Sequence, residues 1–390
     1  MANVSQIYEI LNSASKQAFG ESAVVVTDTS SFIALGSTVL RSDADTENYL
    51  NTLVDRIGKT VFSVRNYQKF DEYVIKQPFE FGAILQKIYV EMPTAKQNNA
   101  WEIGKVDYKP EFAPVIKPNV KQKLFNNIST WEIDVTIPDT MLKTAFTSET
   151  TMSAFISAIF VAMENAMVIK LENAVDLTRS SFIARKLHSN KPCGAINLLK
   201  QYNALTTKGL TVPECLMDAD FLKWSSAEIN KWVKRISRMS TLFNDEGYQR
   251  HTPRENLVVD VLQDYSSATT AFLQSNTYHA EMVSLPMYHE VPYWQGSGDN
   301  YSFESTSSIN IKLDETTTVN KSGIIACIYD EQALGVTINE RRTTSERNNK
   351  DEYTDYFNKA NMGYFNDMSE NGIVFYLDTG TCGKFVLFSI

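Results

Sequence analysis

The longest regular pattern of apolar residues lies between Ser148 and His188, a stretch that contains neither Gly nor Pro. Apolar side chains recur there at three- and four-residue steps, at Met152, Phe155, Ile156, Ile159, Phe160, Met163, Met167, Leu171, Val175, Phe182 and Leu187. This period predicts one continuous helix of roughly 60 Å, begun by the N-cap Ser148 and stopped before Pro192. Because Glu164 interrupts the apolar run, we interpret the helix as buried in protein and not as a membrane span.

Two stretches that precede this helix alternate with a period of two. The first follows Gly82 and places Ile84, Ile88, Val90 and Met92 on one face. The second, Thr130 to Ile137, places Trp131, Ile133, Val135 and Ile137 on one face. We expect these strands to pair as a long hairpin with Pro93 to Asn127 at its tip. Since an isolated hairpin is barely stable in water, its apolar face is expected to lie on a partner.

The first 75 residues contain short segments with too few apolar positions to form a core of their own. A first helix is predicted by the spacing of Ile7 and Leu11. We interpret Ala23 to Thr27 and Ser31 to Thr38 as extended segments, and Asp45 as the N-cap of a second helix. This arm is therefore expected to pack on other parts of the protein.

Helical and extended patterns alternate between about residue 206 and residue 332, which favours a mixed α/β domain. Strands are predicted at Leu210 to Met217, Asn256 to Val261, Ser308 to Leu313 and Gly323 to Tyr329, and helices at Asp218 to Met239 and Tyr265 to Leu273. After Ala333 the pattern returns to strands, at Val336 to Asn339 and Gly372 to Leu377, with the charged segment Glu340 to Thr354 between them.

Composition indicates a protein with a large core, because 43% of the 390 residues are hydrophobic. The net charge of -9 argues against a general nucleic-acid binder, since such proteins place Lys and Arg against phosphates. The cysteines are widely spaced and lack a CxxC pair, so we predict neither a zinc site nor a disulfide framework, and reduced thiols in a cytoplasmic setting. The amino terminus lacks the basic flank and apolar region of a signal peptide.

No common catalytic motif is present: GxGxxG, GxxxxGK, GxSxG and HExxH are all missing from the sequence. The group His279, Glu281, His289 and Glu290 has suitable atoms for a metal, but its spacing matches no ligand pattern. Two alternatives are expected for the basic cluster of Arg341, Arg342 and Arg347: contact with phosphate, or an intersubunit ion-pair network. The acidic residues among the arginines favour the ion-pair network. We therefore predict no enzyme, no cofactor and no metal site.

Four segments of the chain, in this order, resemble the major capsid proteins of tailed bacteriophages, which have the Hong Kong ninety-seven type fold. They are ENYLNTLVDRIGKTV (47–61), WEIDVTIPDTMLKTAFTSE (131–149), IIACIYDEQALGVTI (324–338) and YFNDMSENGIVFYLD (364–378). The resemblance implies an α+β fold with an N-terminal arm (1–75), an extended β-hairpin loop (76–138), a peripheral domain with a long spine helix (139–205), an axial α/β domain (206–332) and returning strands of the peripheral domain (333–390). Size and arm are most similar to capsid proteins of small short-tailed phages of Gram-positive hosts.

The resemblance implies a structural protein that self-assembles as pentamers and hexamers into an icosahedral shell around double-stranded DNA. It places the protein in the virion, after assembly in the host cytoplasm, with a portal as partner and without a membrane. We expect the scaffold to be a separate protein, because the chain has no room for a scaffolding domain before the arm. No covalent cross-link is expected, although the lysines between Lys96 and Lys123 are candidates.

Intersubunit contacts are expected at Ile88, Val90, Trp131, Ile133, Arg341, Arg342 and Arg347. The apolar face of the hairpin is predicted to cover a neighbour's spine helix or peripheral domain, so a charge at Trp131 should leave soluble chains without closed shells. Two alternatives stay open. An encapsulin-like shell of the same fold would enclose a cargo enzyme in place of DNA, and an unrelated α/β enzyme would be a monomer with catalytic activity.

Overall fold

The computed structural model describes residues 4–20, 23–41, 44–46, 48–49, 52–53, 74–76, 85–93, 95, 117–146, 149–189, 191, 193–274, 288–295 and 307–379. The chain divides into two compact units, each built from three separate stretches. Unit 1 comprises residues 1–80, 128–175 and 336–363, and unit 2 comprises residues 81–127, 176–335 and 364–390. The five-part division in chain order stays a prediction.

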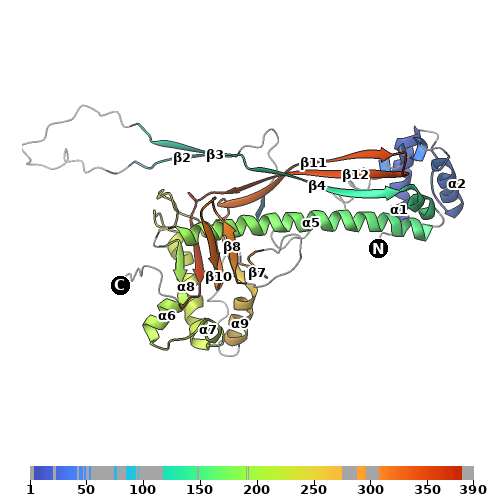
Figure 1. Cartoon of the computed structure of the whole chain (residues 1–390). Coiled ribbons are helices and arrows are strands. Elements are labelled where there is room, and N and C mark those ends of the chain that lie inside the picture. Colours follow the sequence, from blue (N-terminus) through green and yellow to red (C-terminus); the bar gives the residue numbers. More distant parts are fainter. Residues whose placement is uncertain are drawn as a thin grey trace, which may run out of the picture. The chain divides into compact units, whose positions relative to one another are not determined.

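Helices and strands both contribute much of the described structure (Figure 1). The helices are α1 (Val4–Phe19), α2 (Thr29–Val39), α4 (Asp139–Ala145), α5 (Glu149–His188), α6 (Leu198–Thr206), α7 (Val212–Cys215), α8 (Ala219–Ile236) and α9 (Gln263–Gln274). The strands are β1 (Ile75–Lys76), β2 (Leu85–Val90), β3 (Val120–Phe125), β4 (Ile128–Pro138), β5 (Ala195–Asn197), β6 (Leu257–Leu262), β7 (Tyr288–Val291), β8 (Ile309–Lys312), β9 (Thr318–Lys321), β10 (Ile324–Asp330), β11 (Leu334–Asn348), β12 (Tyr353–Asn366) and β13 (Gly372–Tyr376).

The predicted long helix is confirmed, because α5 runs through 40 residues. Its N-terminal part belongs to unit 1 and its C-terminal part to unit 2. Leu171, Val175 and Phe182 of the predicted stripe are buried, whereas the side chains at Met152, Ile156, Ile159, Phe160 and Met163 lie outside the described residues. None of the described helices is long and apolar enough to cross a lipid bilayer.

Unit 1 is built on a four-stranded sheet with the order β1-β11-β12-β4. β4 pairs with β12 in antiparallel register, from Pro138 opposite Tyr353 to Ile128 opposite Gly363. Residues from the arm helices, α4, α5 and the sheet form one apolar cluster, which includes Leu11, Phe32, Leu35, Ile137, Phe146, Phe155 and Tyr356. The arm therefore packs within its own unit, and the predicted helix after Asp45 contributes Tyr49 and Leu53 to this cluster.

One arm segment has a different structure from the one expected. Ser31 to Thr38 was expected to be extended, but it lies in α2, which begins at the N-cap Asp28. The Asp28 side chain accepts the backbone N–H of Ser31 at 2.8 Å, and the Ser31 hydroxyl accepts the backbone N–H of Asp28 at 3.0 Å. This reciprocal capping satisfies the first free donors of the helix and outweighs the weak helix propensity of its Ser, Thr and Val residues.

The expected hairpin between residues 84–92 and 130–137 is also wrong. β2 pairs with β3, and β4 pairs with β12. The error has a simple cause, because β3 has the sequence VKQKLF, whose apolar residues do not alternate. The charged segment after Asn339 was not expected to be a strand either, yet it forms the second half of β11.

Unit 2 contains a five-stranded sheet with the order β5-β13-β10-β6-β7. β10 pairs antiparallel with β6 and β13, while β5 and β7 add in parallel at the edges. All six residues of β6 and all seven of β10 are buried, as their apolar sequences predict. A Cβ atom at Gly372 would lie 2.6 Å from the Phe182 ring, so only glycine lets β13 approach α5 this closely.

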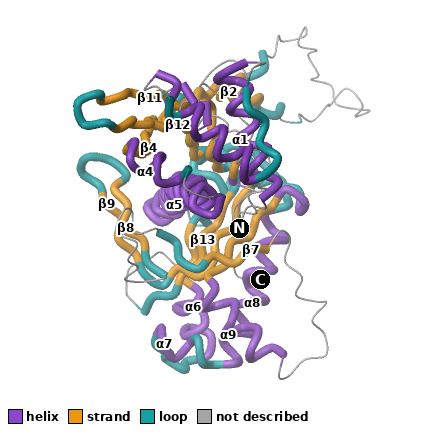
Figure 2. Tube along the Cα trace, turned by 90° about the vertical axis from the view of Figure 1, so that its right-hand side faces the viewer, coloured by secondary structure: helices purple, strands orange, loops and turns teal. Residues whose placement is uncertain are grey.

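Helices gather at one end of this sheet, where both views show α6, α7 and α9 (Figures 1 and 2). The predicted helix after Asp218 is confirmed as α8, and its inward residues Leu222, Ile229, Trp232, Val233 and Ile236 are buried. The predicted strand at Leu210 to Met217 is wrong, because Thr211 and Glu214 form a capping box around Pro213 and start α7.

Candidate interaction surface on the β2–β3 hairpin

The β2–β3 hairpin has two chemically different faces. Its register places Leu85 opposite Phe125, Ile88 opposite Gln122 and Val90 opposite Val120. Because side chains alternate along a strand, opposite residues share a face. We call the face with Gln86, Ile88, Val90, Val120, Gln122 and Leu124 the aliphatic face. The other, which we call the anchor face, carries Leu85, Lys87, Tyr89, Lys121, Lys123 and Phe125.

The aliphatic face is exposed. Ile88, Val90, Val120 and Leu124 have between 52% and 62% of their surface accessible. Isolated apolar residues on a surface are ordinary, but four on one face of a two-stranded ribbon form a contiguous patch of the kind that marks an interaction site. Ile88 and Val90, which the sequence selected as contact residues, both lie in this patch.

The anchor face is held to the rest of unit 2 by ion pairs. Lys87 and Lys123 lie directly opposite each other, so their like charges would repel without a counterion. Asp367 supplies it, with one carboxylate oxygen 3.1 Å from each ammonium group. Lys87 also lies 3.5 Å from Glu370, and Lys123 pairs with Glu246.

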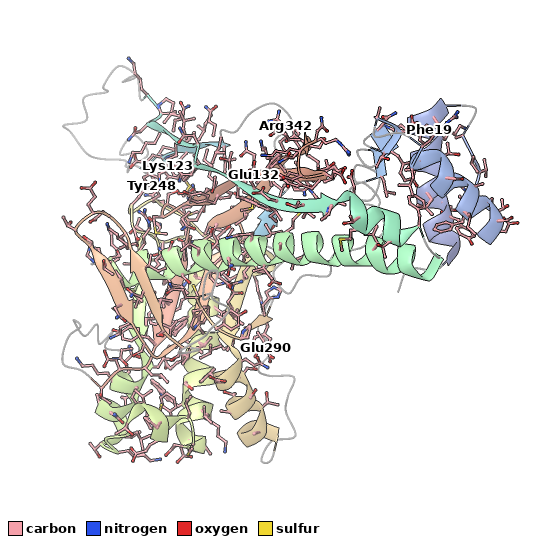
Figure 3. The ribbon with its side chains drawn as sticks, turned by 45° about the vertical axis from the view of Figure 1, so that its right-hand side comes forward. Phe19, Lys123, Glu132, Tyr248, Glu290 and Arg342 are labelled. Carbon is pink, nitrogen blue, oxygen red and sulfur yellow. The ribbon has the colours of Figure 1, made fainter. Side chains whose placement is uncertain are left out.

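An aromatic stack continues these contacts one row further along the hairpin. The rings of Tyr89 and Tyr248 lie 4.3 Å apart and are parallel to within 2°. Lys121 lies 4.6 Å from the Tyr248 ring and Arg250 lies 5.3 Å from the Tyr89 ring, so a cation covers each side of the stack. The backbone N–H of Gln249 donates to the Tyr89 hydroxyl at 3.2 Å. Figure 3 labels Lys123 on the hairpin and Tyr248 on the segment that meets it.

We call the contacts of Lys87, Tyr89, Lys121 and Lys123 with Glu246, Tyr248, Arg250, Asp367 and Glu370 the anchor. Burial alone would raise the pKa of Asp367, but the Ser369 hydroxyl and the two lysines outweigh it and lower that pKa. Burial raises the pKa of Glu370, and Lys87 and Arg250 offset this only in part. The surroundings thus favour the charged form of Asp367 and disfavour that of Glu370.

The remaining predicted contact residues lie on unit 1, in the β11–β12–β4 sheet. Trp131 and Ile133 are half-buried on β4, opposite Ala360 and Asn358. They therefore do not share a face with Ile88 and Val90, because the hairpin that would have joined them does not form. Their contact with a neighbouring subunit stays a prediction.

The three arginines of β11 are in different environments. Arg347 forms an ion pair within the chain, 2.7 Å from Asp139, and both side chains are almost completely buried. Arg341 is half-buried. Arg342 is exposed beside a shallow depression of about 440 Å³, which Glu132 and Lys359 also line (Figure 3). Of the three, Arg342 keeps its charge most accessible for a neighbouring subunit.

The described residues offer little to a metal ion. No three of their His, Cys, Asp and Glu side chains are grouped to hold one, and His279 and Glu281 lie outside the described range. Glu290 instead accepts the Ser266 hydroxyl at 2.6 Å, beside the Tyr288 hydroxyl (Figure 3). Burial raises the pKa of Tyr288 to about 12, so this hydroxyl stays protonated and acts as a structural donor.

Sequence reasoning missed the anchor. The alternation of Lys87 and Tyr89, and of Lys121 and Lys123, was the available signal for a second, polar face. Their partners are distant in the chain, since Lys87 pairs with Asp367 and Glu370 and Lys123 pairs with Glu246, and no local pattern relates residues so far apart.

The comparisons of this chain with known protein families and proteins agree on phage major capsid proteins. A model of the family described as Phi29-like phage major capsid protein matches residues 7–376. The major capsid protein of Bacillus phage PZA is 24% identical over an alignment of 236 residues, and the match covers 58% of this chain and 50% of that protein. The chain thus spans about half the length of this curated relative.

Two solved structures have a similar fold. One is from the capsid of Staphylococcus phage Andhra, with a TM-score of 0.50 and 10% identity over 80% of this chain and 84% of that chain. The other comes from a structure of the head fiber and inner core protein gp22 of native bacteriophage P68, with a TM-score of 0.52 and 12% identity over 78% of this chain and 84% of that chain. At these identities the similarity concerns the fold alone, and it agrees with the α+β class expected from the sequence.

Proposed function

The chain belongs to the Phi29-like phage major capsid proteins, and from this premise we propose that it is the subunit of a closed protein shell. The observation that carries the proposal is the two-faced hairpin. Its anchor face is occupied within its own subunit, so the exposed Ile88, Val90, Val120 and Leu124 are left for a neighbouring copy. A face of this kind gains stability only when a second chain covers it.

The proposed assembly consists of pentamers and hexamers in an icosahedral shell that encloses double-stranded DNA. Rings form when one surface of a subunit contacts a different surface of the next, and a projecting hairpin supplies such a second surface. Large permanent interfaces bury about 2,000 Å² or more, so the hairpin is one contact among several. The expected partners are a portal and a separate scaffolding protein, with assembly in the host cytoplasm.

The acidity of the chain suits a container for DNA. Its net charge of -9 disfavours adhesion of phosphates to the wall, and DNA packed inside brings its own cations. The encapsulin-like alternative is less well supported, because the family match is to phage capsid proteins. An enzymatic role is disfavoured for the same reason.

The proposal is tested by the substitution Ile88→Glu, with Ile88→Leu as a matched control that keeps the position apolar. Both are made in the chain expressed alone and together with its neighbouring genes. Because Ile88 is exposed, the fold should survive in each variant, which circular dichroism checks. Wild type and Ile88→Leu should give closed particles, or isolated pentamers and hexamers, by size-exclusion chromatography and electron microscopy. Ile88→Glu should give folded chains without shells.

Two outcomes would refute the proposal. One is a wild-type chain that stays monomeric under both conditions. The other is a full yield of normal particles from Ile88→Glu, which would show that the aliphatic face is not an intersubunit contact.

A further inference from the structure

We propose that Asp367, Lys87 and Lys123, together with the Tyr89–Tyr248 stack, are positioning residues that fix the direction in which the hairpin leaves unit 2, and thereby the geometry of the shell. The second part of this inference rests on the proposed function. The first part concerns the isolated subunit and stands on the contacts within unit 2.

The carboxylate at the centre of the anchor is itself held rigidly. Asp367 accepts the Ser369 hydroxyl at 2.7 Å and the Ser369 backbone N–H at 3.0 Å. Its own backbone N–H donates to the carbonyl of Ala333 at 2.6 Å. The side chain of Asp367 is fully buried, so the two lysines that reach it are tied to a fixed point of unit 2.

The lysines depend on this carboxylate more than an ordinary surface pair does. Lys87 and Lys123 face each other across the hairpin, and neutralising Asp367 would leave two adjacent ammonium groups with less compensation. Lys87 also donates to the carbonyl of Gln332 at 2.6 Å. This row of ion pairs therefore ties both strands to unit 2 at the same position along the hairpin, through Lys87 on β2 and Lys123 on β3.

The aromatic stack holds the next row. One ionic row alone would permit the hairpin to tilt about it, whereas a second contact at Tyr89 removes that freedom. The planar stack resists tilting because its rings are parallel and in close contact. Phe125, at the end of β3, adds a ring contact to the buried Phe365 at 5.6 Å. These contacts all lie on the anchor face, so they fix direction without using the aliphatic face.

The direct test is the distance between the hairpin and the rest of unit 2 in the unassembled subunit. Nitroxide labels are placed at Gln122→Cys, on the aliphatic face, and at Arg238→Cys, both exposed positions, in the full chain with Cys382→Ser. The described native cysteines are buried and do not compete for the label. Pulsed electron paramagnetic resonance should give one narrow distance distribution for the labelled wild type.

Two variants should broaden this distribution. Asp367→Asn removes the negative charge that both lysines share and keeps the size of the side chain nearly constant. Tyr89→Ala removes one ring of the stack, and Tyr89 lies outside the core of the five-stranded sheet. Tyr89→Phe keeps the stack and is the matched control, which should stay narrow. Measurement of the labelled wild type at 1 M salt needs no substitution in the anchor, so it remains informative if Asp367→Asn fails to fold. Screening of the partly exposed lysines should broaden the distribution there to a smaller extent.

The inference is overturned if the distribution stays narrow in Tyr89→Ala and in the wild type at 1 M salt. For the shell, Tyr89→Ala should produce particles of mixed diameter, whereas Tyr89→Phe should produce the wild-type diameter. Uniform wild-type particles from Tyr89→Ala would overturn the claim about shell geometry. A wild type that never assembles would instead refute the proposed function, and the distance measurement would still decide whether the anchor positions the hairpin.

Discussion

Unit 2 contains two clusters of ion pairs that differ in how deeply the charged side chains are buried. In the first, at α5, Arg179 lies 2.9 Å from Asp260, and both side chains are completely buried. The Tyr329 hydroxyl donates to Asp260 at 2.8 Å. In the second, the hairpin anchor, Asp367 is buried but Lys87 and Lys123 remain 18% and 28% exposed.

The difference decides what each cluster does. When one partner of a buried ion pair is removed, water cannot solvate the charge that remains, so breaking the pair is costly. The Arg179–Asp260 cluster therefore specifies how α5 lies on its sheet. Lys186 on the same helix follows this pattern, because burial lowers its pKa and Asp245 only partly restores it. In the anchor, water reaches the lysines and salt can screen them. The hairpin is thus fixed by contacts that can be loosened without unfolding the sheet.

The largest expected effect comes from the buried pair. Asp260→Ala removes the completely buried partner of Arg179 and leaves only Asp176, at 3.2 Å, to compensate the guanidinium charge. It should lower the free energy of unfolding of unit 2 by about 3 kcal/mol. Asp220→Ala is the control, because its pair with Lys208 is largely exposed and should contribute less than about 1 kcal/mol. Urea denaturation followed by circular dichroism measures both. Equal shifts in the two variants would contradict the distinction between the clusters.

An intermediate effect is expected at the anchor, and it should depend on pH. Asp367→Asn should cost about 2 kcal/mol at pH 7, since hydrogen bonds to charged groups contribute about 1.5–3 kcal/mol. Because the pKa of Asp367 is lowered in the folded protein, its contribution is complete above the unfolded value of about 3.9 and is lost as pH falls through the folded pKa.

The measurement compares urea midpoints of wild type and Asp367→Asn between pH 7 and pH 3. The difference between them should stay constant down to about pH 4 and then shrink. Glu370, whose pKa is shifted the other way, is present in both proteins and largely cancels. A difference that grows as the pH falls would contradict the assigned role of the Asp367 charge.

The smallest effect is expected from the stack. Tyr89→Ala should lose about 0.5–1.5 kcal/mol of local stability, so the amides of β2 and β3 should exchange with deuterium up to about tenfold faster. The amides of β6 and β10 should be unchanged, because they lie in the buried sheet. Tyr89→Phe should match the wild type. A loss in Tyr89→Phe as large as in Tyr89→Ala would indicate that the hydroxyl, and not the ring, makes the contact.

The sequence predicted the elements whose burial pattern is strong and local. α5, α8 and the strands β6 and β10 were expected close to their observed bounds, since their apolar residues repeat at the helical period or run continuously. The resemblance to tailed-phage capsid proteins rested on four segments (47–61, 131–149, 324–338 and 364–378) and on their order, and the family match confirms it.

The elements that were missed depend on short-range hydrogen bonds or on distant partners. α2 and α7 start at capping boxes that outweigh their apparent strand pattern. β3 has no clear apolar alternation, because the polar Gln122 lies on its aliphatic face and the apolar Phe125 lies on its anchor face. Ile88 and Val90, expected as intersubunit contacts, are exposed, and their contact with a neighbouring subunit stays a prediction. The strand β3, which completes their face, was not predicted.

The most direct test of the account is electron cryo-microscopy of assembled particles at a resolution that shows side chains. The account predicts that the aliphatic face of each hairpin, with Ile88 and Val120, lies on a neighbouring subunit, while Lys87 and Lys123 contact Asp367 of their own chain. Particles in which that face is open to solvent, or in which the lysines reach the Asp367 of a neighbour, would contradict it.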